Sequence, residues 1–247
     1  MSIKSNTILI TGASSGIGLD VARGFLEAGS NVVLNARNAE RLTDAAAHLD
    51  PQDRIALVPG DIANPETGVT MVNAAIDRFG SVDVLINNAG IFGLKPFLEN
   101  TEKDLDSYIN INLKGTYFVT QAVVRQMKRQ EPFGGSIVNI GTVLVEHPSA
   151  SLPASAALIS KGGVHALTTS LASELAADNI RVNAVAPGVI RTPIYGDADL
   201  DVLGGTALLN RAGEVGEITE AVVHLASANY TTGVIMPVDG GYVHGRA

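Results

Sequence analysis

The sequence contains no cysteine, which excludes disulfide bonds, thiolate metal ligands and a cysteine nucleophile. This absence is compatible with a reducing compartment, and we expect a cytoplasmic protein. Positive charge is also scarce, because 17 Lys and Arg stand against 25 Asp and Glu, a formal net charge of −8, with no basic run. We therefore expect no nucleic-acid partner. The 5 histidines show no paired spacing of the kind that indicates a metal site.

Long apolar runs are missing as well. No stretch approaches the length of a membrane span, so we expect no membrane partner. The first predicted strand begins within the first ten residues, so we expect no signal peptide. Hydrophobic residues still make up 46% of the 247 residues, enough for a full core without disulfide or metal staples.

Short apolar runs alternate with helical patterns along the whole chain. Runs that predict strands lie at 6–10, 31–35, 54–58, 82–87, 136–140, 180–186 and 233–238. Patterns that predict helices lie at 19–28, 39–49, 65–79, 101–129, 154–177 and 217–226. The strands are too apolar for a sheet with one face in water, so we predict an α/β Rossmann fold, a doubly wound parallel sheet of about seven strands with helices on both faces. Without a linker, residues 1–247 are predicted to form one domain.

Two signals mark the ends of the longest predicted helix. Thr101 is expected to cap its N-terminus, and the helix should run to about Arg129. Gly134 and Gly135 are expected to close it. In a sheet of this kind a ligand binds beyond the carboxyl ends of the strands, at the switch point next to the first strand.

The segment TGASSGIG at 11–18 joins the first predicted strand to the first predicted helix. Gly12 allows the sharp exit from the strand, and Gly16 lets the backbone approach a bound pyrophosphate. Gly18 lets the helix pack closely on the sheet. The free N–H groups at the start of that helix favour anionic oxygens. This context predicts a phosphate-binding turn.

Ser14 and Ser15 add hydroxyl donors where phosphate oxygens would lie. Residues 12–16 also match G-x-S-x-G, the nucleophile elbow of α/β-hydrolases, with His244 as a possible later member of a triad. That elbow follows several strands in hydrolases, whereas this match follows the first, so we rank the hydrolase reading far lower.

The motifs together resemble the short-chain dehydrogenase/reductase family over nearly the whole chain. They are TGASSGIG at 11–18, Asn-Asn-Ala-Gly at 87–90, Asn112, Pro-Gly-Val-Ile-Arg-Thr-Pro at 187–193 and Val-Asp-Gly-Gly-Tyr at 238–242. The resemblance implies hydride transfer between a nicotinamide cofactor and a small carbonyl or alcohol. It also implies assembly as a homotetramer or homodimer through the two long helices and the last strand.

The resemblance, together with the chemistry of these residue types, predicts that the following residues contact the cofactor: Gly12, Ser14, Ser15, Gly16, Ile17, Gly18, Asn35, Arg37, Asp61, Ile62, Asn88, Ala89, Gly90, Lys161, Pro187, Gly188, Val189, Ile190 and Thr192. A ribose with free hydroxyls is usually held by an acidic residue at the end of the second strand, whereas a 2′-phosphate requires a cation. Here Ala36 stands where NAD-preferring relatives have the acidic residue, and Arg37 follows it. We therefore expect NADP(H).

The family's catalytic residues are Asn, Ser, Tyr and Lys, and this chain departs from that set. The resemblance gives the roles of Asn and Lys to Asn112 and Lys161, and Thr142 takes the place of Ser with its hydroxyl retained. Ala157 stands four residues before Lys161, where the family has its proton-donating Tyr. The loop between Thr142 and Ala157 is also longer than the family's. No metal is expected.

Alanine cannot donate a proton, so a substitute is needed if the protein is an enzyme. His147 and Ser155 lie in or beside the remodelled loop, and Ser160 adjoins Lys161. Tyr195 begins a predicted lid, Tyr195–Leu209, that carries Asp, Gly and Leu. Each has an ordinary structural explanation as a solvated or capping residue. The alternative function is a catalytically silent NADP(H)-binding protein with a role in sensing or assembly.

Overall fold

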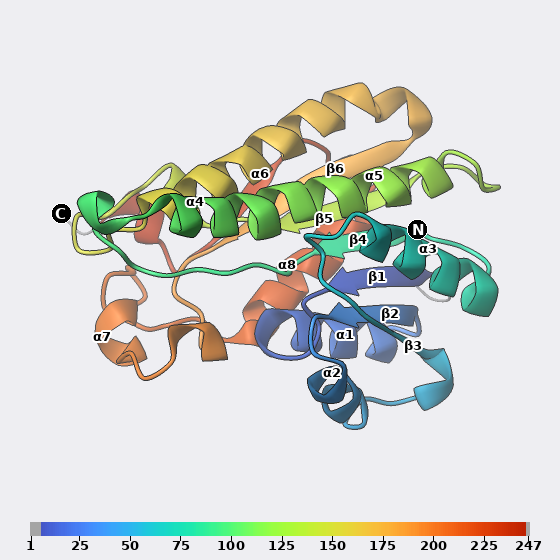
Figure 1. Ribbon diagram of the computed structural model, residues 1–247, viewed down its shortest axis with the longest axis horizontal. Coiled ribbons are helices and arrows are strands. Elements are labelled where there is room, and N and C mark those ends of the chain that lie inside the picture. Colours follow the sequence, from blue (N-terminus) through green and yellow to red (C-terminus); the bar gives the residue numbers. More distant parts are fainter. Residues whose placement is uncertain (1–5, 246–247) are drawn as a thin grey trace.

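A computed structural model describes residues 6–245, which are built around one parallel sheet (Figure 1). Its strands are β1 (Thr7–Thr11), β2 (Asn31–Ala36), β3 (Ile55–Pro59), β4 (Val84–Asn87), β5 (Gly135–Ile140), β6 (Ile180–Pro187) and β7 (Ile235–Val238). They lie in the order β3-β2-β1-β4-β5-β6-β7, and every pairing is parallel. The predicted doubly wound sheet of seven strands is confirmed.

Helices cover both faces of this sheet, as the alternating sequence pattern requires. They are α1 (Gly16–Glu27), α2 (Ala39–Ala46), α3 (Glu66–Phe79), α4 (Glu102–Tyr108), α5 (Thr116–Met127), α6 (Ser155–Glu174), α7 (Leu200–Gly204) and α8 (Val215–Ser227). In Figure 1, α4, α5 and α6 run along one side of the sheet, and α1 and α2 lie on the opposite side. Within residues 6–245, no helix combines the length and the apolar character that crossing a bilayer demands.

The core is divided in two by the sheet, because successive strand residues point to opposite faces. Ile8 and Ile10 of β1 pack with Phe25 of α1 and Val222 of α8 in one cluster. Leu9, between them, belongs to the second cluster, together with the apolar faces of α3 and α5. All of these side chains are buried. The near-continuous apolar strands of the sequence thus reflect burial on both sides.

The long helix predicted over 101–129 is not one regular helix. Thr101 caps its start as expected, and the backbone N–H of Asp104 donates to its hydroxyl oxygen at 3.2 Å. A π-helical segment, Ile109–Gly115, then separates α4 from α5. The helix ends at Met127, and the N–H of Gly134 donates to the Met127 carbonyl oxygen at 3.0 Å, so Gly134 closes the helix end as predicted, whereas Gly135 already belongs to β5.

Two other predicted elements are shorter than expected because side chains occupy their backbone groups. The strand predicted from Val82 begins at Val84, since the side chain of Gln130 binds both the N–H (3.1 Å) and the C=O (2.9 Å) of Val82. The helix predicted over 39–49 ends at Ala46, whose carbonyl oxygen accepts a 2.8 Å hydrogen bond from the Gln52 amide.

The switch point of the sheet lies between β1 and β4, where the strand order reverses. Thr11 ends β1, and its hydroxyl oxygen accepts hydrogen bonds from the backbone N–H groups of Asn88 and Ala89, both at 3.0 Å. This residue therefore holds the loop after β4 against the glycine turn after β1. The fold places a ligand site at this junction.

Candidate active site

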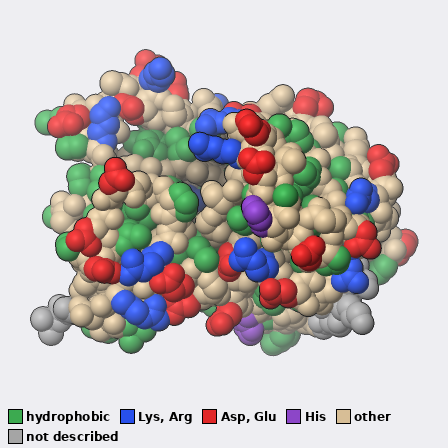
Figure 2. Space-filling view, turned by 90° about the horizontal axis from the view of Figure 1, so that it is seen from below, with side chains coloured by type: hydrophobic (Ala, Val, Ile, Leu, Met, Phe, Trp, Pro, Cys, Tyr) green, Lys and Arg blue, Asp and Glu red, His purple; other side chains and the backbone are tan. Residues whose placement is uncertain are grey.

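A cavity of about 710 Å³ opens at the carboxyl ends of β1, β4, β5 and β6. Figure 2 shows this side of the molecule hollowed, with hydrophobic side chains in and around the hollow. The predicted cofactor residues that line it are Gly12, Ser14, Ser15, Gly16, Ile17, Asn35, Arg37, Asp61, Ile62, Asn88, Ala89, Gly90, Lys161, Pro187, Gly188, Val189, Ile190 and Thr192. Gly18 is the one predicted cofactor residue that does not line the cavity. Of the predicted catalytic residues, Thr142 and Lys161 line it and Asn112 lies behind it.

The glycine turn has no room for side chains. Gly12 has φ +68°, and a Cβ on it would lie 2.7 Å from the Cα of Ala89. A Cβ on Gly18 would lie 2.4 Å from the carbonyl oxygen of Gly12, so Gly18 serves the packing of α1 on the turn. Ser15 is the N-cap of α1, and its side chain makes no capping hydrogen bond. The N–H groups of the first helical turn thus remain available to an anion.

One end of the cavity carries two arginines on the segment after β2. Arg37 and Arg41 both line the cavity and are exposed. Ala36, the last residue of β2, contributes no charge. Asn35 also lines the cavity, but its amide nitrogen donates to the carbonyl oxygens of Val58 (2.9 Å) and Gly60 (3.0 Å). Asn35 thus fixes the ends of β2 and β3, and the arginines supply the charge.

Asn112 sits in the π-helical segment and is 1% exposed. Its Oδ1 accepts a 2.8 Å hydrogen bond from the N–H of Ile91, and its Nδ2 donates to the carbonyl oxygen of Ile91 (3.0 Å) and to Oγ of Ser160 (2.9 Å). The hydroxyl of Ser160 in turn donates to the carbonyl oxygen of Ala157 at 2.6 Å. Single-turn π segments occur frequently at functional sites. Here the segment ties the loop after β4 to α6.

Lys161 projects from α6 into the cavity and is half-buried. Its Nζ donates a 2.6 Å hydrogen bond to the carbonyl oxygen of Ile140 at the end of β5. Burial lowers the pKa of the Lys161 ammonium to about 8, because the charged form loses water. A Cβ on Gly90 would lie 3.5 Å from this Nζ, so the bare glycine keeps the space beside the lysine open.

Thr142 follows β5 and lines the cavity beside Lys161. Its hydroxyl oxygen accepts from the N–H of Leu144 at 3.3 Å, which leaves its own hydrogen free to donate. The backbone N–H of Thr142 lies 3.5 Å from Nε2 of His165, whose Nδ1 is 2.8 Å from Oε1 of Glu146. A Cβ on Gly141 would lie 2.2 Å from that Nε2, so only glycine fits there.

Ala157 is 1% exposed and contributes nothing to the cavity wall. Tyr195 of the lid and Tyr242 near the C-terminal end both line the cavity. The side chains of His147 and Ser155, which the sequence offered as substitutes for a tyrosine, are not part of the wall. The backbone carbonyl of His147 accepts a 3.2 Å hydrogen bond from the Tyr242 hydroxyl.

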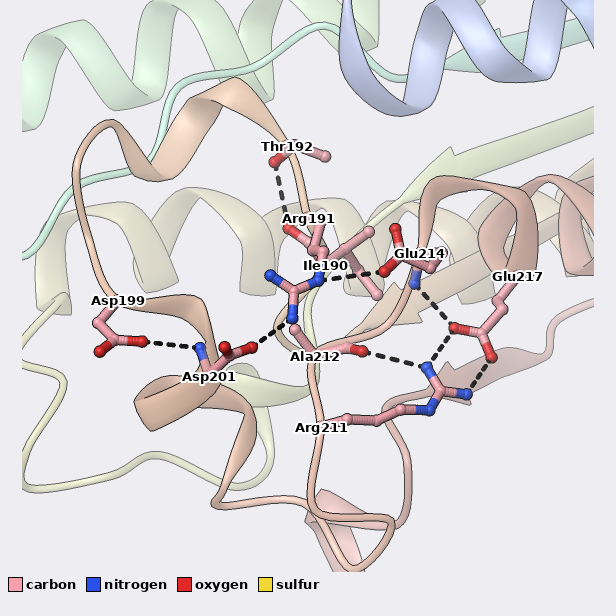
Figure 3. Close-up of polar contacts among 9 residues, drawn as sticks. All are labelled: Ile190, Arg191, Thr192, Asp199, Asp201, Arg211, Ala212, Glu214 and Glu217. Atoms are coloured by element: carbon pink, nitrogen blue, oxygen red, sulfur yellow. Dashed lines mark hydrogen bonds and ion pairs between the residues drawn. The ribbon is translucent and has the colours of Figure 1, made fainter.

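Ion pairs fasten the lid that follows β6 (Figure 3). Arg191 binds Asp201 of α7 through one guanidinium nitrogen, and its Nε lies 3.1 Å from Oε1 of Glu214 at the start of α8. Arg211 and Glu217 form a second pair, with Nη1 and Oε2 at 2.9 Å. Figure 3 shows the two arginines on neighbouring loop segments that flank the lid, each turned toward its carboxylates. Arg191 therefore ties α7, which belongs to the lid, to the start of α8.

The sequence analysis missed three features of the site. Arg41 lies on α2, four residues after Arg37. Counting the cations that follow the second predicted strand would have identified it. Tyr242 belongs to the motif at 238–242 that resembles the family. It is far along the chain from the other site residues, so the sequence did not indicate that it lines the cavity. The contact of His165 with the turn after β5 depends on how α6 packs.

Comparison with known proteins agrees with this geometry. A family model described as short chain dehydrogenase matches residues 6–202. The chain is 34% identical over 255 residues to L-rhamnose-1-dehydrogenase of Scheffersomyces stipitis, covering 97% of this chain and 96% of the relative. L-Sorbose reductase from Gluconobacter frateurii, solved with NADPH and L-sorbose, has a TM-score of 0.89 at 28% identity, covering 98% of this chain and 99% of that one. The 3-ketoacyl-(acyl-carrier-protein) reductase from Brucella melitensis, solved with NADH, has a TM-score of 0.91 at 29% identity with the same coverage.

The chain therefore belongs to the short-chain dehydrogenase family. It is an oxidoreductase of this type, and the family uses nicotinamide cofactors and acts on small molecules. The two solved relatives hold different nicotinamide cofactors, NADPH in one and NADH in the other.

Proposed function

We propose that this protein is an NADP(H)-dependent oxidoreductase that interconverts a small ketone or aldehyde and its alcohol. The observation that carries the proposal is the meeting of the glycine turn, Thr142 and Lys161 in one cavity. When bound, the cofactor supplies or accepts the hydride. The turn fits a pyrophosphate, because its glycines exclude side chains and the first turn of α1 offers free N–H groups.

Each polar residue at the reacting end has a task that its contacts support. Thr142 donates its free hydroxyl hydrogen to the substrate oxygen. Lys161 binds the nicotinamide ribose, and Ile140 orients its Nζ. Asn112 belongs to the hydrogen-bond group that joins Ile91 to α6, and in this proposal that group orders a water next to Lys161.

The choice of NADP(H) over NAD(H) is supported by charge. Arg37 and Arg41 line the cavity at the end of β2, and Ala36 replaces the carboxylate that would repel a 2′-phosphate. Charge-assisted bonds from guanidinium to phosphate are among the strong ones in proteins. Asp61 also lines this end, but its Oδ1 accepts a 2.9 Å hydrogen bond from the N–H of Ala63.

A second candidate function is a catalytically silent NADP(H)-binding protein with a sensing or assembly role. The observation that favours it is Ala157, which stands where the family has its tyrosine and is buried away from the cavity. A positioned general acid typically contributes about 10²–10⁴-fold in rate, so its loss is severe.

One experiment separates the two functions. NADPH oxidation is followed over a panel of aldehydes, ketones and vicinal diketones with the wild type and Ala157→Tyr. We expect turnover by the wild type, which would establish that another donor exists. Activity of the variant alone would support the silent binder, because the rest of the site would then be intact. Inactivity of both would reject this substrate class.

We also propose that the protein is cytoplasmic and assembles as a homotetramer or homodimer, as the resemblance to its family implies. Analytical ultracentrifugation would measure the assembly directly. A monomer at micromolar concentration would contradict the proposal.

A further inference from the structure

We propose that Lys161 itself is the proton donor of this site, acting on the substrate oxygen through one water molecule in the cavity that Lys161 and Thr142 both line. This inference rests on the proposed function. It assigns to the lysine a role additional to ribose binding and explains how the site can work with Ala157.

Few proton donors face the substrate end of the cavity. Among residues 6–245, the titratable side chains that line its wall are Arg37, Arg41, Asp61, Lys161, Tyr195 and Tyr242. The first three lie at the end with the expected 2′-phosphate site. Three candidates therefore remain for the reacting end, one lysine and two tyrosines.

The two tyrosines are poorer donors than the lysine. The Tyr242 hydroxyl already donates its hydrogen to the carbonyl oxygen of His147 at 3.2 Å. Burial raises the pKa of the Tyr195 phenol, which makes it a weaker acid. Tyr195 also belongs to the lid, whereas a positioned donor is best held on a rigid element.

Lys161 is held rigidly and has an acid strength suited to neutral pH. The carbonyl oxygen of Ile140 fixes its Nζ at 2.6 Å, and two N–H hydrogens remain for other partners. The pKa of the ammonium is lowered to about 8 by burial alone, and neither a carboxylate nor a second cation contributes to the shift. Its hydrogen-bond partner, the Ile140 carbonyl, and Gly90 beside it carry no charge. A general acid works best with a pKa near the operating pH.

The cavity itself leaves room for a water. Lys161 and Gly90 both line its volume of about 710 Å³, and Gly90 has no side chain beside Nζ, whereas Ala157 is buried outside the wall. A water accepting from Nζ and donating to the substrate oxygen would therefore bridge the two.

The step balances in atoms and charge. The carbonyl carbon receives a hydride from the reduced nicotinamide, which becomes oxidised, and the carbonyl oxygen gains the electron pair of the broken π bond. The bridging water gives a proton to that oxygen and takes one from Nζ of Lys161. The neutral amine then recovers a proton from solvent. Alcohol oxidation runs through the same atoms in reverse.

The test combines kinetics with direct titration of the lysine. Lys161→Arg keeps a cation for the ribose but cannot release a proton at any ordinary pH. We expect kcat/KM for carbonyl reduction to fall by about 10²–10⁴-fold, while NADPH affinity changes far less. Ala157→Tyr in the Lys161→Arg background supplies a new donor and should recover part of the lost rate. Tyr195→Phe and Tyr242→Phe are the matched controls.

Lysine side chains labelled with ¹³C at Cε report the pKa of Lys161 without cofactor, and the Lys161→Arg spectrum assigns the signal. We expect a titration near pH 8, matching the pH above which wild-type reduction declines. A titration near the ordinary lysine value would overturn the inference, as would loss of the pH-dependent decline in Tyr195→Phe or Tyr242→Phe. Wild-type inactivity would instead reject the proposed function, and with it the donor role.

Discussion

Nδ1 of His165 on α6 lies 2.8 Å from Oε1 of Glu146 in the turn after β5. His165 follows Lys161 by one helical turn, and its Nε2 faces the backbone N–H of Thr142 at 3.5 Å. The imidazole thus joins the segment that carries Thr142 to the helix that carries Lys161. The ring is buried, whereas the carboxylate is half exposed.

Replacing His165 should therefore loosen this junction. We expect His165→Ala to lower the free energy of unfolding by about 2–3 kcal/mol, because a buried ring is lost and the N–H of Thr142 loses its acceptor. Urea denaturation measures the change. Glu146→Gln retains a side-chain oxygen for Nδ1 and should cost less than about 1 kcal/mol. Equal losses in both variants would show that the charge of Glu146, and not the ring, holds the turn.

Arg37 should discriminate between the two nicotinamide cofactors. Removing one charge-assisted contact to a 2′-phosphate costs about 1.5–3 kcal/mol, so Arg37→Ala should weaken NADPH binding roughly 10- to 100-fold. NADH binding should hardly change, because its ribose carries no phosphate. Fluorescence titration with both cofactors tests this. Arg23→Ala is a control, since Arg23 pairs with Asp20 on α1 and does not line the cavity. An equal loss for NADPH and NADH would contradict the assignment.

The Arg211–Glu217 pair predicts a pH-dependent contribution to stability. The guanidinium of Arg211, and then the N–H of Glu214, lower the pKa of Glu217 to about 2. A lowered folded-state pKa stabilises the protein above the unfolded value near pH 4.5, and this stability disappears as the pH falls toward 2. Glu217→Gln should therefore cost stability at pH 7, by less than about 1 kcal/mol for an exposed pair. The cost should shrink at pH 3. Denaturant unfolding at both pH values tests it, and an equal cost would contradict it.

Arg191 should control the mobility of the lid. Its contacts with Asp201 and Glu214 join the segment after β6 to α7 and α8. Arg191→Met should accelerate hydrogen exchange across 193–209 and raise KM more than it changes kcat, because the lid closes over the substrate end. Lys128→Met removes an ion pair with Asp178 far from the lid and serves as the control. Unchanged exchange in Arg191→Met would show that packing alone holds the lid.

The sequence predicts the fold well because the physical signals are local. Apolar strands, the glycine turn and Thr101 each act through their immediate neighbours, and the structure places them as expected. The start of β4 is mispredicted for a distant reason, since Gln130 binds Val82 from 48 residues away. The end of α2 is mispredicted for a local one, since the Gln52 side chain binds Ala46 from six residues away, a contact that apolar periodicity does not reveal. The apolar periodicity likewise does not distinguish the π-helical segment from the α-helices on either side of it.

The candidate site divides in the same way. Its backbone-defined part, the glycine turn and the segments after β4 and β6, could be predicted from motifs that fix the path of the chain. Its side-chain chemistry could be predicted only in part. Thr142, Lys161 and Tyr195 are candidates from the sequence and line the cavity, whereas Tyr242 reaches it from a terminal turn that no local pattern positions. Arg41 is an intermediate case, because it lies only four residues after Arg37 and could have been identified from the sequence, but it was missed.

Because His165 approaches Gly141 so closely, we expect substitutions at these two positions to be coupled in evolution. A side chain at 141 would overlap the imidazole, with only 2.2 Å between its Cβ and Nε2. Related sequences that carry alanine or serine at this position should therefore carry a smaller residue at 165. The fitness of either substitution depends on the other, so covariation across the family would record how the turn after β5 and α6 have changed together.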